Sequence, residues 1–275
     1  MESRYLVDSV RAERMTSAEL RASFLVEGLF APGELKLLHW EAERTIVGSA
    51  VPLGVPLALE TPAELKAPSF CARRELGVVN VGGAGKVTVD GTAHALVHRD
   101  ALYVGRGTKS VAFASDDAAR PALFYLVSHP CHADHPTRRV IEAEAQTFRL
   151  GEPARANVRT LRRYIHPAAL PTGQLVMGVT DLESGSVWNT MPPHRHGRRT
   201  EVYLYFDLEP DQVVFHFMGR PGETRHLVVR NLQVVLSPVW SMHFAAATSR
   251  YAFVWAMGGE NQEFDDMQGV PLAEL

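Results

Sequence analysis

Cysteine is scarce in this sequence, and long apolar runs are missing. Cys71 and Cys131 are the only cysteines in 275 residues, too few for the disulfide framework of a small secreted protein. No stretch approaches the roughly 20 apolar residues that cross a bilayer. The segment from Met1 to Arg14 carries charges throughout and lacks the apolar centre of a signal peptide. These absences predict a soluble cytoplasmic protein with no membrane partner.

An excess of charge of either sign is also missing. The chain has 28 Lys and Arg against 31 Asp and Glu, which gives a formal net charge of -3. This balance gives no reason to expect a nucleic-acid partner. Hydrophobic residues make up 46% and charged residues 21%, close to ordinary soluble usage. A chain of this length buries a sizeable core, as one large all-β domain or as two smaller domains.

One helix is expected near the N-terminus. Thr16 and Glu19 have the spacing of a capping box, and Leu20, Phe24 and Leu25 follow at helical intervals. These residues predict a helix over residues 17–27. This is the one helix that the sequence predicts.

The rest of the chain is typical of an all-β protein. Short β-prone runs are broken by glycine and proline, and Asp90-Gly91 between two of them predicts a tight hairpin. The segment 128–153 does not continue this pattern of short β-prone runs and is interpreted as a connector. The runs on its two sides follow one another in a similar order, which suggests a duplicated β-barrel. The predicted domains are 1–135 and 136–275. The expected strands cover residues 45–47, 77–81, 86–89, 101–104, 110–113, 174–179, 202–206, 213–218, 226–229, 233–236 and 251–256.

The sharpest functional signal lies at residues 193–201. His194 and His196 are two apart, so in a strand both imidazoles leave the same face. A short turn containing Gly197 would bring Glu201, on the next strand, back beside them. Two imidazoles and a carboxylate on neighbouring strands make a plausible partial shell for a divalent metal.

Two other interpretations compete with this site. A pair of histidines alone is often no more than a polar strand face. A second cluster of zinc-type ligand residues also occurs, but its spacing matches no closed pattern and two prolines interrupt it. It consists of His129, Cys131, His132 and His135. The corresponding part of the first half, residues 73–80, has no histidine, so the N-terminal barrel is expected to be metal-free.

The spacing His-x-His-x4-Glu resembles the first motif of the cupin superfamily. Residues 237–243 resemble the second motif in Pro238 and His243, with Trp240 where glycine is usual. This resemblance implies a bicupin, that is, two jelly-roll β-barrels with a short N-terminal helix. It also implies that His243 is the fourth metal ligand, beside His194, His196 and Glu201.

Longer strings resemble the 5-keto-4-deoxyuronate isomerase family, from about Glu19 to the C-terminus. They are RRELGVVNVGGAG at 73–85, HRDALYVG at 98–105, WNTMP at 188–192, ETRH at 223–226 and GENQEFDDM at 259–267. Members interconvert 4-deoxy-L-threo-5-hexosulose uronate and 3-deoxy-D-glycero-2,5-hexodiulosonate during bacterial pectin and polyuronate breakdown. The resemblance implies that reaction, one zinc ion per chain and a homohexamer. Manganese, iron or nickel would not contradict the ligand set.

Aldose–ketose isomerisation also needs proton transfer and a grip on the substrate carboxylate. Glu223, His226 and Tyr164 are candidates for proton transfer. Guanidinium groups bind carboxylates in a bidentate fashion, so an arginine is expected to hold the substrate. The candidates for that role are Arg159, Arg163 and Arg225.

The same four ligands would also serve other functions. A cupin dioxygenase using iron, nickel or copper is one alternative, and a non-catalytic sugar-binding cupin is another. Only the long family strings favour the isomerase over the dioxygenase. A sugar sensor usually carries a DNA-binding helix-turn-helix, and the sequence gives no pattern for one.

Overall fold

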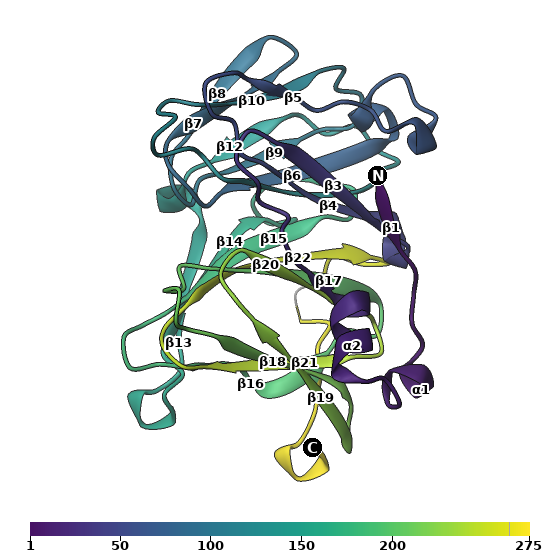
Figure 1. Ribbon diagram of the computed structural model, residues 1–275, viewed down its shortest axis with the longest axis vertical. Helices are drawn as coiled ribbons and strands as arrows, with labels where there is room; N and C mark the ends of the chain where they lie inside the picture. The colour runs from purple at the N-terminus through teal and green to yellow at the C-terminus, as the bar shows by residue number, and fades with distance from the viewer. Residues whose placement is uncertain (264) are drawn as a thin grey trace. The chain divides into compact units, whose positions relative to one another are not determined.

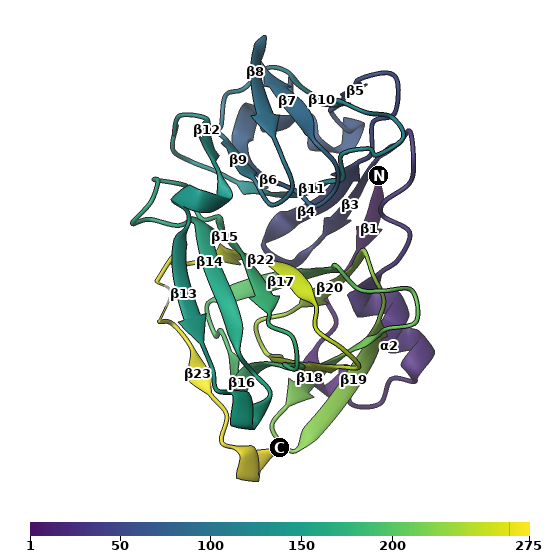
Figure 2. The same cartoon turned by 90° about the vertical axis from the view of Figure 1, so that its left-hand side faces the viewer.

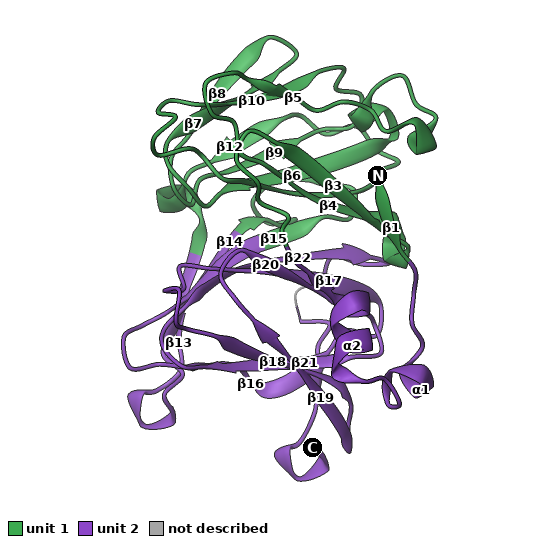
Figure 3. Cartoon of the chain, viewed as in Figure 1, with its two compact units in different colours: residues 1–4, 28–146, 164–177 green, residues 5–27, 147–163, 178–275 purple. Residues whose placement is uncertain are grey.

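The computed structural model describes residues 1–263 and 265–275, so residue 264, inside the string 259–267, lies outside the described part. Strands make up most of the regular secondary structure of the described chain (Figure 1). It divides into two compact units (Figure 3). Unit 1 comprises residues 1–4, 28–146 and 164–177, and unit 2 comprises residues 5–27, 147–163 and 178–275.

Unit 1 contains two sheets. In spatial order, the larger sheet has β1 (Glu2–Arg4), β3 (Leu35–Trp40), β4 (Thr45–Ala50), β11 (Phe124–Pro130), β6 (Arg74–Asn80), β9 (Ala101–Val104) and β12 (Arg138–Val140). The smaller has β5 (Leu57–Ala58), β10 (Val111–Ser115), β7 (Gly85–Val89) and β8 (Thr92–Leu96). Alternate apolar residues of both sheets form one buried core, which includes Val78 and Leu126 from the first and Val87 and Phe113 from the second.

The predicted Asp-Gly hairpin is confirmed in unit 1. Strands β7 and β8 pair from Val89↔Thr92 to Gly85↔Leu96. Asp90 has φ +46° and Gly91 has φ +84°, the positive values that a two-residue turn of this hand requires.

Unit 2 also contains two sheets, which are most easily followed in Figure 2. The first has β13 (Gln146–Leu150), β14 (Arg159–Ile165), β15 (Val176–Leu182), β22 (Ala252–Gly259), β17 (Arg199–Phe206), β20 (Gln233–Ser237) and β2 (Leu25–Val26). The second has β19 (Glu223–Val229), β18 (Val214–Arg220), β21 (Met242–Ala247), β16 (Trp188–Arg195) and β23 (Gln268–Gly269). All expected strands of this half are present, with ends shifted by a few residues.

The expected N-terminal helix is confirmed, although it is shorter than predicted. Helix α1 (Ser9–Ala12) precedes α2 (Ser17–Phe24), whose capping box joins Thr16 and Glu19 in both directions. The prediction that the helix reaches residue 27 was wrong. Leu25 and Val26 instead pair with Val235 and Val234 of β20, so strand hydrogen bonds replace the last helical turn.

The segment read as a connector also forms strands. It contains the end of β11, then β12, the 3-10 turn at Glu142–Glu144 and β13. Its polar composition is compatible with strands because β12 and β13 are edge strands with exposed side chains. The other 3-10 turns are Ala42–Arg44, Ala63–Leu65, Phe70–Arg73, Pro153–Arg155 and Leu272–Glu274. Among the described residues, no helix has the length and apolar character needed to span a bilayer.

Candidate metal centre

Three strands of unit 2 bring the predicted metal ligands together. His194 lies in β16, with His196 directly after that strand, and Glu201 lies in β17 after a short turn. His243 lies in β21 and is the antiparallel partner of His194. Directly opposed residues in such a pair have Cβ atoms about 5 Å apart, so their side chains can meet over one face.

The ligand atoms converge closely. One nitrogen from each of His194, His196 and His243 lies within 4.8 Å of the other two. Nε2 of His243 is 3.2 Å from Nε2 of His194. Oε2 of Glu201 is 3.2 Å from Nε2 of His243 and 3.4 Å from Nε2 of His196.

Backbone carbonyls fix the orientation of all three imidazoles. His196 donates from Nδ1 to the carbonyl of Asp266 at 2.8 Å. His194 and His243 make ring hydrogen bonds with the carbonyls of Pro192 and Ser241. Because the second nitrogen of each ring is occupied in this way, Nε2 presents its lone pair to the centre of the cluster. Metal-binding histidines are commonly held by this kind of outer hydrogen bond.

These atoms fit a divalent ion. Ligands at tetrahedral angles on bonds of about 2.1 Å lie about 3.4 Å apart. The observed separations of 3.2 to 3.4 Å match that spacing. Oε2 of Glu201 is buried and has no hydrogen-bond partner. A buried carboxylate oxygen without a donor is costly unless a cation occupies the position that it faces.

Burial sets the protonation of the cluster. Burial and the neighbouring His196 lower the pKa of His194 to about 4, and burial lowers the pKa of His243 well below its ordinary value. Burial raises the pKa of Glu201, but His196 and the hydroxyl of Tyr203 outweigh it and leave that pKa lowered. Neutral imidazoles and an ionised carboxylate are the states that bind a metal.

Two residues that support this cluster were not identified from the sequence. Tyr203 donates a hydrogen bond to Glu201 from two positions further along β17. Arg199, fully buried, lies two positions before Glu201, with Nη2 3.3 Å from Nδ1 of His196 and Nε 3.8 Å from Oδ2 of Asp266. Strand alternation places all three β17 side chains on one face, and that signal could have found them.

Trp240, the residue that departs from the cupin motif, is held by the N-terminal segment of unit 2. Its Nε1 donates to the carbonyl of Val7 at 3.0 Å. Its ring meets Phe24 of α2 edge-on, with centroids 6.0 Å apart. The turn that leads to His243 is therefore supported by a side chain that glycine would not provide.

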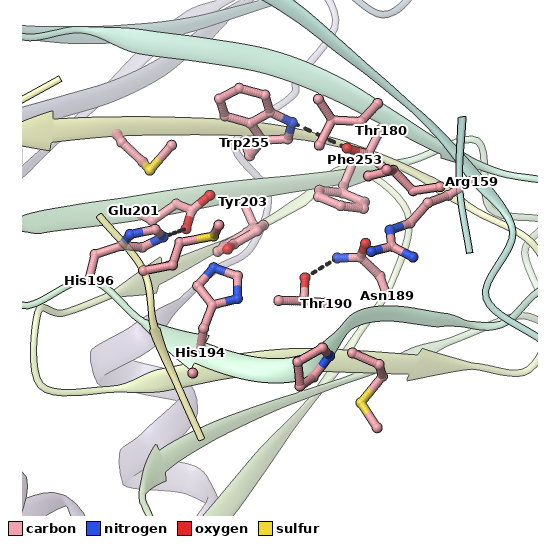
Figure 4. Close-up of a pocket in the computed structure, with 17 residues that line it drawn as sticks. Arg159, Thr180, Asn189, Thr190, His194, His196, Glu201, Tyr203, Phe253 and Trp255 are labelled. Atoms are coloured by element: carbon pink, nitrogen blue, oxygen red, sulfur yellow. Dashed lines mark hydrogen bonds and ion pairs between the residues drawn. The ribbon is translucent and has the colours of Figure 1, made fainter. Parts of the chain in front are cut away.

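A cavity of about 370 Å³ opens beside the cluster and is lined by His194, His196 and Glu201. Figure 4 shows Arg159 at the other end of this pocket, with Asn189 and Thr190 between. Trp255 forms part of the wall and donates to Thr180 at 3.2 Å. A side chain at Gly178 would come within 2.2 Å of this indole, so the wall requires a glycine there.

The three candidate residues on β14 have different environments. Arg159 lines the pocket and donates from Nη1 to the carbonyl of Asn157 at 2.9 Å. Arg163 lies outside the pocket lining, with its guanidinium 4.7 Å from the ring centroid of Phe148. Tyr164 is fully buried and has the opposite strand parity, so it leaves the other face of β14 from Arg159.

The remaining candidates lie on β19, the edge strand of the second sheet. Glu223 and His226 are exposed. Arg225 donates to the carbonyl of Glu13. None of the three lines the pocket, because β19 is separated from β16 by β18 and β21.

The competing cluster in unit 1 does not converge. Within the described residues, His194, His196 and His243 form the only group of three or more ligand side chains close enough to share one ion. The thiol of Cys131 donates to the carbonyl of Ala133, and His129 is buried beside Thr45.

The family model described as the KduI/IolB family matches residues 27–269. The chain belongs to the KduI/IolB family. It is 48% identical over 275 residues to the 4-deoxy-L-threo-5-hexosulose-uronate ketol-isomerase of Halalkalibacterium halodurans, with all of both chains covered. It is 50% identical to the protein of the same name from Formosa agariphila, over all of this chain and 98% of that one.

Solved structures agree with the fold of this KduI/IolB-family chain. An IolB-like protein from Salmonella typhimurium has a TM-score of 0.73 at 15% identity, covering 90% of this chain and 96% of that one. Oxalate decarboxylase from Lactobacillus farciminis has a TM-score of 0.60 at 9% identity, covering 89% of each. The predicted all-β cupin fold is confirmed, and this member of the KduI/IolB family is an isomerase.

Proposed function

We propose that this isomerase converts 4-deoxy-L-threo-5-hexosulose uronate to 3-deoxy-D-glycero-2,5-hexodiulosonate in polyuronate breakdown, with a divalent ion, preferably zinc, held by His194, His196, Glu201 and His243. The observation that carries the proposal is the shared cavity. The four candidate ligands and Arg159 line or adjoin one pocket of about 370 Å³. That volume lies within the range of small-ligand sites, and the names of the relatives supply the substrate.

The bound ion would polarise the substrate carbonyl and stabilise negative charge that develops on its oxygen. The chain's own part in this chemistry is to hold the ligands in place. The carbonyls of Pro192, Asp266 and Ser241 fix the three imidazole rings. Tyr203 fixes the carboxylate of Glu201. Since these partners are preorganised, little reorganisation is needed when the substrate binds.

Arg159 is the group that we assign to the substrate carboxylate. It is half-buried, and burial lowers the pKa of its guanidinium. Its hydrogen bond to the carbonyl of Asn157 uses Nη1, so Nη2 and Nε can face a carboxylate. Binding the carboxylate at this end would place the carbons of a six-carbon sugar acid toward the ligand cluster.

Tyr203 also lines this pocket and bears a proton on its hydroxyl. Burial and the charge of Glu201 raise its pKa well above the ordinary value. The phenol therefore keeps its proton at neutral pH and acts as a hydrogen-bond donor rather than as a base. Glu223, His226 and Tyr164 remain proposals for proton transfer that would require contact with substrate from outside the pocket lining.

The test joins activity to metal content. The purified protein is incubated with the 4-deoxy-5-keto-uronate from lyase-digested polygalacturonate, and conversion is followed by NMR. We expect about one metal ion per chain, loss of conversion on chelation and recovery with zinc. Conversion that persists in protein stripped of metal would contradict the metal role. Oxygen uptake without isomerisation would favour the dioxygenase alternative.

A further inference from the structure

A second cavity, in unit 1, collects positive charge. It has a volume of about 460 Å³, and its lining includes Arg44, Arg73, Arg74 and Arg106. His132 lies on the same lining. None of the described residues that line the cavity is an aspartate or glutamate. This cavity is far along the chain from the metal ligands and plays no part in the function proposed above.

Arg74 is the deepest of these cations. Only 7% of the surface of Arg74 is exposed. Nε donates to Oγ of Ser128 at 3.0 Å, and Nη2 donates to the carbonyls of Ser128 and Arg44 at 2.8 and 2.6 Å. All three acceptors are neutral, so the charge is hydrogen-bonded but not balanced. A buried cation without a counter-ion is costly in free energy, and burial lowers the pKa of Arg74 to about 10.

The other arginines add to this excess. Arg73 donates from Nη2 to the carbonyls of Leu65 and Lys66, which are also neutral. Arg44 adjoins Arg74 closely enough for its charge to act on it. Only Arg106 has a carboxylate, Asp134, at 2.6 Å, and that acid lies outside the cavity lining.

The backbone contacts give Arg74 a structural role, since it ties β6 to β11 and to the turn at Arg44. That structural role accounts for the hydrogen bonds of Nε and Nη2 of Arg74. It does not explain why the other arginines line the same cavity. A purely structural site would be served by one arginine, and three more around the same cavity would repel it. An anion in the cavity would remove this repulsion.

We propose that this cavity binds a small phosphate monoester. A phosphate dianion has three oxygens for several guanidinium forks, whereas a single carboxylate would leave most of the charge unmatched. Leu65 and Phe70, which also line the cavity, provide apolar surface for a short carbon frame. The volume is sufficient for a ligand of that size.

Titration calorimetry on the metal-loaded, full-length protein tests the proposal, with glycerol 3-phosphate as the probe. Inorganic phosphate, sulfate and galacturonate serve as comparison ligands. We expect saturable binding of glycerol 3-phosphate with a dissociation constant below about 1 mM, and weaker binding of galacturonate. The variants Arg73→Gln and Arg44→Gln should each weaken binding about tenfold. Both avoid Arg74, whose loss would disturb folding.

The matched control is Arg120→Gln, which removes one positive charge from an exposed position of unit 1, paired with Asp117. It should leave affinity within about twofold of the unsubstituted protein, because Arg120 does not line the cavity and salt screens a charge that does not contact the ligand. A His194→Ala variant should also keep its affinity. The proposal would be overturned by absence of saturation or by equal weakening in Arg120→Gln. Loss of binding in His194→Ala would also overturn it, because the phosphate would then bind at the metal centre. Because binding is measured directly, failure of the isomerase assignment would leave this test intact.

Discussion

The indole nitrogen of Trp240 donates a 3.0 Å hydrogen bond to the carbonyl of Val7, 233 positions earlier in the chain. The N-terminal segment of unit 2 thereby supports the turn that ends at His243. We expect Trp240→Phe to lower the free energy of unfolding by at least about 1 kcal/mol, because the hydrogen bond is lost while an aromatic ring is kept beside Phe24. Trp240→Gly, which restores the usual cupin residue, should cost about 3 kcal/mol. Denaturant unfolding measures both, and a Trp240→Gly protein as stable as the parent would contradict this role.

The bond between Tyr203 and Glu201 predicts an effect on metal affinity. Tyr203→Phe removes the hydroxyl and keeps the ring, so the protein should fold while binding zinc about tenfold more weakly. Competition with a coloured chelator measures the affinity. The matched control is Tyr205→Phe, because the Tyr205 hydroxyl contacts His216 at 2.7 Å and not Glu201. Equal affinities in the two variants would argue against the orienting role of Tyr203.

Removal of a single ligand should have a larger effect. His243→Ala is expected to lose most of its zinc and to reduce kcat/KM at least about a hundredfold, since the remaining donors no longer close the site. Elemental analysis and the NMR assay test both effects. His226→Ala, an exposed histidine on β19, should retain metal and activity. Loss of activity in His226→Ala would instead support a role for His226 in proton transfer.

Arg159 predicts a defect in substrate binding. Arg159→Ala should lower kcat/KM by about thirtyfold, mainly through KM, because a charge-assisted bond to a carboxylate contributes about 2 kcal/mol. Arg163→Ala is the comparison, since Arg163 lies on Phe148 outside the pocket lining. If Arg163→Ala raises KM and Arg159→Ala does not, the two assignments must be exchanged.

Buried histidines away from the ligand set predict a loss of stability in acid. Burial lowers the pKa of His129 to about 3 and that of His216 to about 4. In the unfolded chain both take up protons near pH 6.5. The unfolded state therefore binds more protons below that pH, and stability falls as the pH drops toward the folded pKa.

For each of these two histidines we expect a loss of about 2 kcal/mol between pH 6.5 and pH 5. Urea unfolding of metal-free protein at several pH values measures the change. His129→Gln should reduce the slope, whereas His226→Gln, at an exposed position, should not. A slope that is the same in all three proteins would show that burial of His129 does not govern it.

The sequence predicts those parts of the site that depend on local geometry. His194, His196 and Glu201 are close in sequence, so strand alternation and a short turn were enough to predict that they meet, although β16 and β17 lie in different sheets and do not pair as a hairpin. His243 required the known second motif, because its pairing with His194 spans 49 positions of the chain. Strand parity could also have identified Tyr203.

Residue type alone gave weaker predictions. Glu223, Arg225 and His226 have suitable chemistry, but they lie on an edge strand that does not reach the pocket. Which strand ends at an edge depends on sheet order, and no local pattern encodes it. For the same reason the sequence could not predict that Leu25 and Val26 leave the helix to join β20.

The pairing of β2 with β20 also bears on synthesis at the ribosome. Leu25 and Val26 leave the ribosome early, while Val234 and Val235 follow roughly 200 residues later. At the usual rates of translation, β2 waits about 10 to 40 s for its partner. During that time residues 28–146 of unit 1 emerge, while β2 has no partner strand until β20 is made. A nascent chain stalled before residue 233 should therefore be protease-sensitive at residues 5–27.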